Sequence, residues 1–488
     1  MPSKRLKTWM FRLFGLVALP GACLAFQFRL DGDRLWLQAE NTPLVDILGQ
    51  FARAGVEVRL DPRIRSAVTG AVRGEELGQA LDSLLEPYDY LLTWKVLRGP
   101  LGRVPKLEEI QVFLPGGKAA ARPIPEKTAT FDATRGVLGS SPEFVKDELL
   151  LAVRPGTTYA QFRRLLDEIG GMIVDADSTT GVYLLRFPPG TNVEALLRQL
   201  ASNPLVAHAE LNYVARLPRA SASPSSAPPL PLVRPPADGS VPVAVLDSGL
   251  DPAAGLAGLV SAGWDAVDPD RALADGDGHG TQMAWLASGV LSAEGAVAGD
   301  PLPLVSIRAF DEEGRTSHFA ILQALAFAAQ AGARVVNMSW GSSTDSDFLR
   351  AAMQSAAARG LLLVAAAGNE PTGAPVYPAA YPEVLAVAGV AGDGQAWASS
   401  NRGEFVDLSA PAFAAFPAAG SSAGGAYAGT SISSAVVANA LAQYLNRHSG
   451  ATADATLAAL RESLSPSPAG GFGAGVLDAA ALARFLAR

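Results

Sequence analysis

The chain has 488 residues, of which 49% are hydrophobic and 18% charged, which favours a folded protein of about two to four domains over a disordered chain. Its net charge of −8 gives no electrostatic footprint for nucleic acid, so we expect no nucleic-acid partner. The single cysteine, Cys23, excludes intramolecular disulfides, cysteine-rich zinc sites and thiol catalysis in the rest of the chain, and the four histidines are too scattered to predict a metal cluster.

The N-terminus predicts an export signal. Four basic residues lie before an apolar stretch: Lys4, Arg5, Lys7 and Arg12. The stretch from Leu13 to Ala25 is too short for an ordinary membrane span and has the length of a signal-peptide core. We therefore expect a signal peptide over residues 1–25, and export to a bacterial periplasm or the medium. Lipidation at Cys23 is one alternative, although Pro20 stands where leucine is usual, and an uncleaved anchor is another.

Residues 28–115 are predicted to form a first small α+β domain. Its expected elements are strand, helix, strand, strand, helix and strand, at residues 34–38, 44–51, 56–60, 67–72, 75–86 and 90–96. Thr42 and Pro43 are expected to cap and start the first helix. This order, with Asn41-Thr42-Pro43-Leu44 and Gly74-Glu75-Glu76-Leu77, resembles the short N-terminal (STN) domain of secretins and TonB-dependent receptors. The resemblance implies an envelope protein as partner, and an unspecialised α+β module is the alternative.

A linker and a second small domain are predicted next. Residues 116–147 are expected to be a linker, because glycine, alanine, proline and lysine are frequent there. Residues 148–216 predict an α+β domain with strands at 149–153, 181–187 and 206–213 and two helices between them. Its endings Asn203-Pro204-Leu205-Val206 and Ala209-Glu210-Leu211-Asn212-Tyr213 resemble those of subtilase propeptides. The resemblance implies a domain that assists folding of a peptidase and inhibits it through its C-terminal tail; a generic β-α-β domain is the alternative.

Residues 217–240 are rich in proline, serine and alanine. Such a stretch cannot bury enough apolar surface to order itself, so we expect an exposed linker that a peptidase could cut.

From residue 241 to the end of the sequence, apolar strands alternate with helices. We expect strands at 243–246, 305–308, 335–339, 361–366 and 385–390, with helices at 319–331 and 349–359. Strands without polar alternation are typical of a parallel sheet that is covered by helices on both faces, so we predict an α/β fold for residues 241–488.

Three segments of this domain carry residues for nucleophilic catalysis. Asp247 directly follows the apolar strand expected at 243–246, His279 lies between glycines in 278–281, and Ser431 follows Gly429-Thr430 at a strand-to-helix junction. The chain order Asp, His, Ser and the motifs around the three residues resemble the subtilase family of serine peptidases. Further segments resemble subtilase motifs: Asn337–Gly341, Ala366–Asn369, Tyr377–Ala379, Ser400–Gly403, Ser409–Pro411 and Gly473–Ala479.

The resemblance implies an exported serine endopeptidase, made as a zymogen, that cleaves proteins or peptides through an acyl-enzyme. Ser431 would be the nucleophile, His279 its base, and Asp247 the residue that orients the imidazole. The side-chain amide of Asn369 and the backbone N–H of Ser431 would bind the oxyanion. The expected substrate-binding residues are Ser339, Trp340, Gly341, Ala367 and Gly368. Small residues at these positions favour a roomy apolar pocket, while Glu370 could attract a basic side chain.

Metal binding is left open by the sequence. Asp275 and Asp277 beside His279 fit either a metal site or a solvated glycine-rich loop. Subtilases often carry structural calcium, but no set of ligands here has the residue types and spacing to assign one, so no cofactor or metal residue is predicted.

Three positions depart from the subtilase pattern. Gln282-Met283 replaces the usual His-Val, Ile432-Ser433-Ser434 replaces Met-Ala-x-Pro, and Asn439 stands where glycine is usual. Because the proline that begins the helix after the serine is absent, the helix register and the rate are in question. These departures keep a second hypothesis open, in which the chain is an envelope signalling or docking module with a weak or inert peptidase domain.

Overall fold

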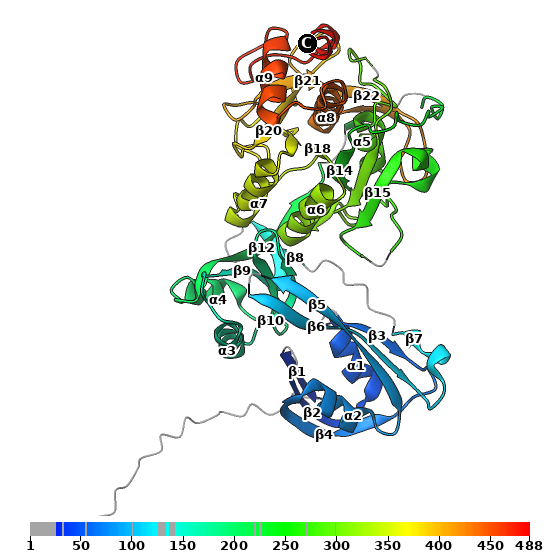
Figure 1. Ribbon diagram of the computed structural model, residues 1–488, viewed down its shortest axis with the longest axis vertical. Coiled ribbons are helices and arrows are strands. Elements are labelled where there is room, and N and C mark those ends of the chain that lie inside the picture. Colours follow the sequence, from blue (N-terminus) through cyan, green and yellow to red (C-terminus); the bar gives the residue numbers. More distant parts are fainter. Residues whose placement is uncertain are drawn as a thin grey trace, which may run out of the picture. The chain divides into compact units, whose positions relative to one another are not determined.

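The computed structural model describes residues 26–31, 34–53, 56–99, 101–124, 133–135, 142–218, 221–223, 227–269, 271–297 and 299–488 (Figure 1). The expected signal peptide, including Cys23, lies outside these residues. The chain divides into two compact units, Met1–Thr93 with Leu107–Glu126, and Trp94–Lys106 with Lys127–Arg488. Within the described ranges, no helix has both the length and the apolar character to cross a membrane.

The first small domain contains two sheets and two helices. The strand orders are β1-β2-β4 and β5-β6-β3-β7. The bounds are β1 Phe26–Asp31, β2 Arg34–Pro43, α1 Leu44–Arg53, β3 Glu57–Leu60, β4 Ala67–Glu76, α2 Leu77–Leu85, β5 Asp89–Gly99, β6 Gly102–Phe113 and β7 Arg122–Pro123. Helix α1 forms because Leu44, Ile47, Leu48 and Phe51 recur every three or four residues and are all buried. The helix begins at the expected Leu44, but Pro43 is not in its first turn, since it still belongs to β2.

The second small domain has one antiparallel sheet, β10-β11-β9-β12, and two helices. The bounds are β8 Ala133–Arg135, β9 Glu143–Val153, α3 Tyr159–Ile169, β10 Met172–Asp177, β11 Val182–Arg186, α4 Val193–Leu200 and β12 Val206–Arg216. Helix α3 begins at a capping box formed by Thr158 and Gln161 and ends at Gly170, whose φ is 70°. One apolar core joins the sheet to both helices, including Phe162, Tyr183 and Leu200.

Both predicted linkers need correction where strands form. In 116–147, β7 pairs with β3, β8 pairs with β9, and β9 itself begins at Glu143. In 217–240, β13 (Ser221–Ser223) pairs with a strand of the C-terminal domain. The composition of a segment indicates how much apolar surface that segment can bury by itself. These short strands form instead because they pair with the edges of strands elsewhere in the chain.

The C-terminal domain contains a seven-stranded sheet, β15-β16-β14-β18-β19-β20-β21, in which every neighbouring pair is parallel. The bounds are β14 Val243–Asp247, β15 Val260–Asp265, β16 Leu304–Arg308, β18 Val335–Met338, β19 Leu362–Ala366, β20 Val384–Val390 and β21 Leu408–Pro411. The prediction of a parallel sheet is therefore confirmed. The five expected strands correspond to β14, β16, β18, β19 and β20 to within one residue at each end, whereas β15 and β21 were not predicted.

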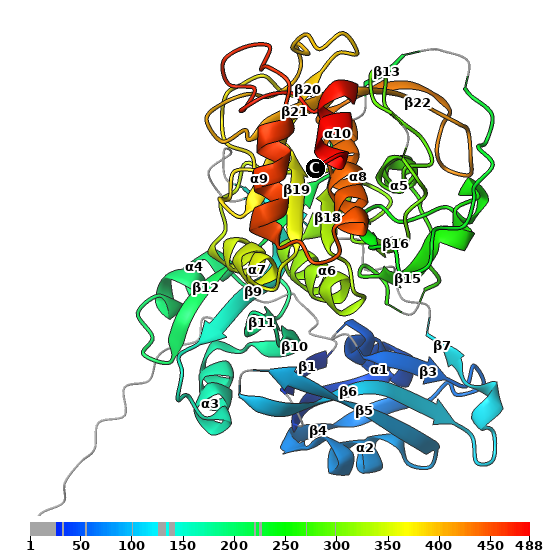
Figure 2. The ribbon, with the colours of Figure 1, turned by 45° about the horizontal axis from the view of Figure 1, so that its top comes forward.

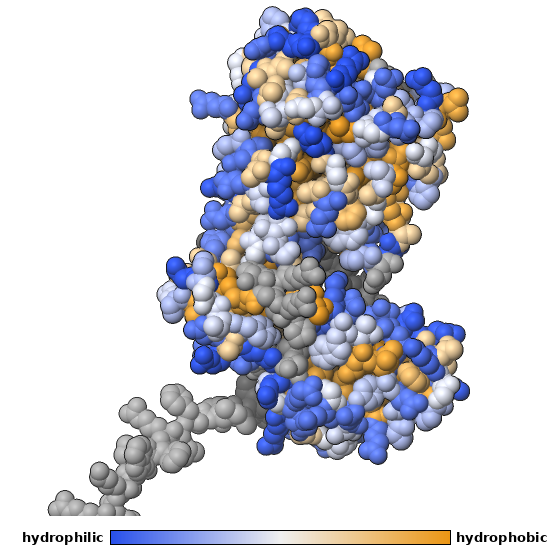
Figure 3. Space-filling model, in the orientation of Figure 1, coloured by the Kyte–Doolittle hydropathy of each residue, from blue (hydrophilic) through white to orange (hydrophobic). Residues whose placement is uncertain are grey.

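Helices cover both faces of this sheet, as predicted (Figure 2). The bounds are α5 His279–Ala287, α6 His318–Gln330, α7 Asp347–Ala358, α8 Thr430–Arg447, α9 Ala453–Ser463 and α10 Ala479–Leu486. Alternate strand residues belong to different cores: Val243 and Val245 pack with α5 and α8, whereas Ala244 and Leu246 pack with α6 and α7. Figure 3 shows hydrophilic and hydrophobic residues mixed over the visible surface.

Three short strands complete the C-terminal domain and flank the site described below. β17 (Arg315–Ser317) lies directly before α6, and β22 (Phe413–Phe416) pairs with β23 (Gly425–Ala428), which leads into α8.

Candidate active site

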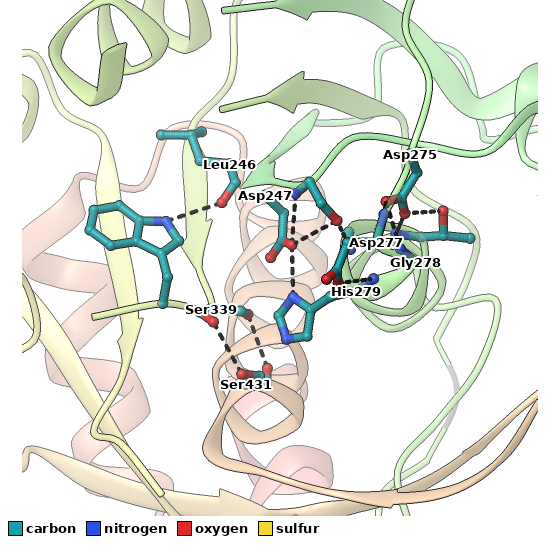
Figure 4. A network of polar contacts seen from close by, with 12 residues as sticks. Leu246, Asp247, Asp275, Asp277, Gly278, His279, Ser339 and Ser431 are labelled. Atoms are coloured by element: carbon teal, nitrogen blue, oxygen red, sulfur yellow. Dashed lines mark hydrogen bonds and ion pairs between the residues drawn. The ribbon is translucent and has the colours of Figure 1, made fainter. Parts of the chain in front are cut away.

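Asp247 and His279 meet at the carboxyl end of β14 (Figure 4). The Asp247 side chain is fully buried, and its Oδ1 atom lies 2.7 Å from Nδ1 of His279 and accepts a hydrogen bond of 2.8 Å from the Ser248 amide. His279 is the first residue of α5, and Gly278 before it has a φ of 95°, which favours glycine. The strand end and the helix start thus hold the carboxylate and the imidazole together.

Asp275 organises the turn that presents His279. Its Oδ1 accepts a hydrogen bond of 2.7 Å from the Gly278 amide, and its Oδ2 accepts from the amide and hydroxyl of Thr281 at 2.8 and 2.6 Å. Its side chain is buried, whereas Asp277 is exposed. We conclude that Asp275 is a structural cap, a role that sequence analysis missed because both acids in Asp275-Gly276-Asp277 look alike without their burial.

The described residues contain no group of three or more His, Cys, Asp or Glu side chains that could hold a metal ion. The carboxylate of Asp275 is instead occupied by the hydrogen bonds of the turn. We therefore assign no calcium site.

Electrostatics around His279 favour its protonated form. Burial alone lowers the pKa of His279, but the negative charge of Asp247 and its hydrogen bond outweigh that effect, and Asp277 and Asp275 add to it. The net result is a pKa above the ordinary histidine value of 6.5. The imidazolium that forms during proton transfer is therefore stabilised.

Ser431 lies in the first turn of α8 and faces the same small cavity as His279 (Figure 4). Its hydroxyl donates a hydrogen bond of 3.1 Å to the carbonyl oxygen of Ser339. Among the described residues, no hydrogen bond joins this hydroxyl to the His279 ring. The serine must therefore rotate away from Ser339 before His279 can take its proton.

Asn369 also lines this cavity. Its Oδ1 accepts hydrogen bonds from the backbone amide and the hydroxyl of Thr430, at 2.9 and 3.0 Å. These two bonds fix the side-chain amide, so that the Nδ2 group remains as a donor. The Ser431 amide and Asn369 Nδ2 are thus two fixed N–H donors at the start of α8.

The predicted substrate-binding residues fall into two groups. The side chain of Trp340 is buried in the core and its indole N–H donates to the Leu246 carbonyl at 3.1 Å, so only its backbone is left to pair with a substrate, and its assignment stays a prediction. Ala367 is likewise buried. Gly341, in contrast, forms an antiparallel bridge with Arg216 of β12. The carbonyl of Ser339 holds the Ser431 hydroxyl, and the amide of Gly368 donates to Thr430 Oγ1.

The departures near Ser431 are accommodated by hydrogen bonds. Helix α8 runs without a break from Thr430, and the Ser434 hydroxyl donates to the Ser431 carbonyl at 2.9 Å. Asn439 donates from Nδ2 to the carbonyl of Ala287, 3.0 Å away at the end of α5. Gln282 is buried beside the cavity, 3.4 Å from the Ser422 hydroxyl. The absent proline and glycine therefore leave the helix register intact.

The C-terminal strand of the second domain enters this site. Val214, Ala215 and Arg216 pair antiparallel with β17, and the Leu217 amide donates to the Gly314 carbonyl at 2.9 Å. Pro218 lines the cavity that contains His279 and Ser431. The chain thus places its own strand where a peptide would have to lie.

Comparisons with known proteins agree with this geometry. The Subtilase family model matches residues 238–475, and the model of the fervidolysin N-terminal prodomain matches residues 136–212. Subtilisin of Bacillus pumilus is 31% identical over 217 residues, covering 43% of this chain and 78% of the relative. Thermitase of Thermoactinomyces vulgaris is 34% identical over 172 residues, covering 35% of this chain. The match spans 62% of thermitase, less than two thirds of its length.

A solved structure also matches. Fervidolysin from Fervidobacterium pennivorans, described as a keratinolytic enzyme related to subtilisin, has a TM-score of 0.57 and 20% identity over 71% of this chain and 61% of its own. At that identity the likeness shows the fold alone, and it confirms the predicted fold class.

Proposed function

Because the chain belongs to the subtilase family, we propose that it is a serine endopeptidase made with its own inhibitory prodomain, and that its substrates are proteins or peptides. One observation carries the proposal. The buried Asp247–His279 pair, the Ser431 hydroxyl and the Asn369 amide converge on one cavity, where they offer base, nucleophile and oxyanion donor together.

The reaction follows from these positions. Ser431 Oγ leaves the Ser339 carbonyl, gives its proton to His279 Nε2 and attacks the substrate carbonyl carbon. Asp247 stabilises the resulting imidazolium, and the Ser431 amide and Asn369 Nδ2 donate to the oxyanion. His279 then protonates the leaving amine. In the second half of the reaction, His279 takes a proton from water as the water attacks the acyl carbonyl carbon, and it returns that proton to Ser431 Oγ as the acyl bond breaks.

Residues 148–216 act in this proposal as the inhibitor. Strand β12 occupies the cleft, while Glu210 and Asn212 accept hydrogen bonds from backbone amides in the first turns of α7 and α6, those of Asp347 and Phe319. A carboxylate at a helix N-terminus also complements the helix dipole. These contacts hold the tail in place whether or not the peptide chain after it is cut.

Export and envelope docking are further parts of the proposal. Residues 1–25 have the charge and apolar pattern of a signal peptide, with lipidation of Cys23 as the variant that would anchor the protein. The order β2-α1-β3-β4-α2-β5 supports the STN-like assignment, and an envelope protein would be its partner.

Fluorophosphonate labelling tests the proposed activity. The processed wild-type protein should be labelled on Ser431, and the Ser431→Ala variant should not. A folded chain that neither labels nor cleaves a peptide would contradict the proposal and favour the docking module with an inert peptidase domain.

A further inference from the structure

Ser339 contacts the nucleophile residue at two points (Figure 4). Its carbonyl oxygen accepts a hydrogen bond of 3.1 Å from the Ser431 hydroxyl, and its own hydroxyl donates at 3.2 Å to the Ser431 carbonyl oxygen. The first bond must break in every turnover, since the Ser431 hydroxyl has to turn toward His279. The second bond holds the backbone of Ser431, and no step of the reaction requires it to break.

A second hydroxyl holds the same carbonyl. Ser434 lies one turn further along α8, and its hydroxyl donates to the Ser431 carbonyl at 2.9 Å. The hydroxyl oxygens of Ser339 and Ser434 are also 3.1 Å apart, within hydrogen-bonding distance of each other. All three serines are buried, so bulk water has little access to compete for these bonds.

Asn337 supplies the start of this series of hydrogen bonds. Its Nδ2 group donates to the Ser339 hydroxyl oxygen at 2.8 Å. An amide nitrogen can only donate, so the Ser339 hydroxyl accepts this bond and keeps its own proton for α8. Asn337 is fully buried in β18, and its Oδ1 atom has no hydrogen-bond partner in the part of the chain that the structure describes. Since a buried polar atom without a partner costs free energy, packing alone does not explain an asparagine at this position.

We infer that Asn337, Ser339 and Ser434 form a positioning chain, which holds the backbone of the nucleophile while its side chain moves. The inference rests on the proposed peptidase function. Ser431 supplies the attacking oxygen and, through its backbone N–H, one of the two oxyanion donors. A rotation of the Ser431 backbone would displace both groups together, and a fixed carbonyl resists that rotation. The proline that is usual after the subtilase serine is absent here, so hydrogen bonds rather than a proline ring fix the first turn of α8.

Ser433 offers a matched control in the same helix turn. It is also buried, but its hydroxyl donates to the carbonyls of Ala410 and Pro411 in β21, at 3.0 and 3.2 Å. It therefore anchors α8 to the sheet rather than to Ser431. Ser433→Ala and Ser434→Ala each remove one buried hydroxyl from neighbouring positions, and only the second change takes a hydrogen bond from the Ser431 carbonyl.

The experiment measures kcat per active site in the processed enzyme, together with the melting temperature. Titration with fluorophosphonate to completion counts the competent sites, so a variant that only folds less well loses sites and melting temperature but keeps its kcat per site. Ser339→Ala, which retains the backbone carbonyl, and Ser434→Ala should each lower kcat per site by about tenfold, less than the roughly hundredfold cost of a displacement of about 1 Å. KM should stay within about twofold of wild type, and the acid limb of the pH profile should not move, because the Asp247–His279 pair is unchanged.

Ser433→Ala should lower the melting temperature but keep kcat per site within about twofold of wild type. Two results would overturn the inference alone. In the first, either Ser339→Ala or Ser434→Ala keeps the wild-type kcat per site; in the second, Ser433→Ala loses as much kcat per site as they do. A wild-type protein that neither reacts with fluorophosphonate nor cleaves a peptide would overturn the inference together with the peptidase assignment.

Discussion

The carboxylate of Glu210 lies at the start of α7, where it accepts hydrogen bonds from the Ser346 hydroxyl and, at 3.2 Å, from the Asp347 amide. Glu210 belongs to the second domain and is only 6% exposed, so this contact with the C-terminal domain is buried. The Glu210 side chain thus accepts the hydrogen bond of a backbone amide at the start of a helix in the C-terminal domain, and by this contact it holds the second domain in place.

Glu210→Gln tests this contact. The amide keeps one acceptor oxygen but loses the charge that complements the helix N-terminus, so the prodomain should dissociate more readily. We expect inhibition by the prodomain to weaken by about tenfold, and activity to appear earlier after the first cut. Glu168→Gln, on the exposed surface of α3, is the matched control and should behave as wild type. Unchanged inhibition in Glu210→Gln would contradict the assigned contact.

Ser431→Ala should abolish peptidase activity and self-processing while the fold is preserved. The serine is buried but small, and the change removes only its bond to the Ser339 carbonyl. Circular dichroism and intact mass should show a folded, uncut chain. Cleavage at the wild-type rate, after contaminating peptidase has been excluded, would contradict the assignment of the nucleophile.

Asn369 allows its two roles to be separated. Asn369→Ala should lower kcat by roughly 10²–10³, with little change in KM, which is the loss measured for the corresponding oxyanion donor of a subtilisin. Asn369→Asp retains the Oδ1 acceptor for Thr430 but replaces the Nδ2 donor. It should lose at least as much turnover. If Asn369→Asp were as active as wild type, the side chain would only position Thr430.

The pH profile should reflect the raised pKa of His279. The base acts when neutral, so kcat/KM should fall as the pH decreases through that pKa, with a midpoint above 6.5. Asp277 is exposed and contributes to the shift, so Asp277→Asn should move the acid limb to lower pH. An acid limb at or below 6.5 in the wild type, measured on a neutral peptide, would contradict this electrostatic account.

Much of the fold and the central site could be predicted from local sequence. Buried parallel strands such as Val243–Asp247 are continuously apolar, and the glycines around His279 and Ser431 mark the turns that present them. Side-chain direction at a strand end could not be predicted. Trp340 belongs to the motif that borders the cleft, yet its ring packs on the opposite side against Phe310. The structural role of Asp275 in the turn before His279 likewise depends on the burial of its side chain, which cannot be inferred from the residue type alone.

Pairing between distant segments was the other missing information. The residues after Arg216 have no apolar periodicity, so their composition predicted an exposed linker. The structure pairs Ser221–Ser223 with β23 because the cleft offers a strand edge more than 200 positions later in the chain. The residues around Ser221–Ser223 in the sequence do not indicate that a distant strand edge is available to pair with them.

Maturation provides the last prediction. Strand β12 ends in the cleft at Arg216, and the first strand of the catalytic sheet begins at Val243, so the first cut should fall between about Val214 and Pro236. The prodomain should remain bound after this cut, because it is held by Glu210, Asn212 and the paired strand together. When one of these contacts breaks, the others keep the prodomain near its site, so the broken contact forms again. Activity should therefore appear later than the cut, when the prodomain is degraded or leaves.

Intact-mass analysis of wild type beside Ser431→Ala measures the cut, and peptide hydrolysis sampled over the same time course measures the delay. A product that begins near residue 220 in wild type only would support the prediction. A wild-type chain that is fully active while still joined to residues 148–213 would contradict it, because β12 would then have to leave the cleft without being cut.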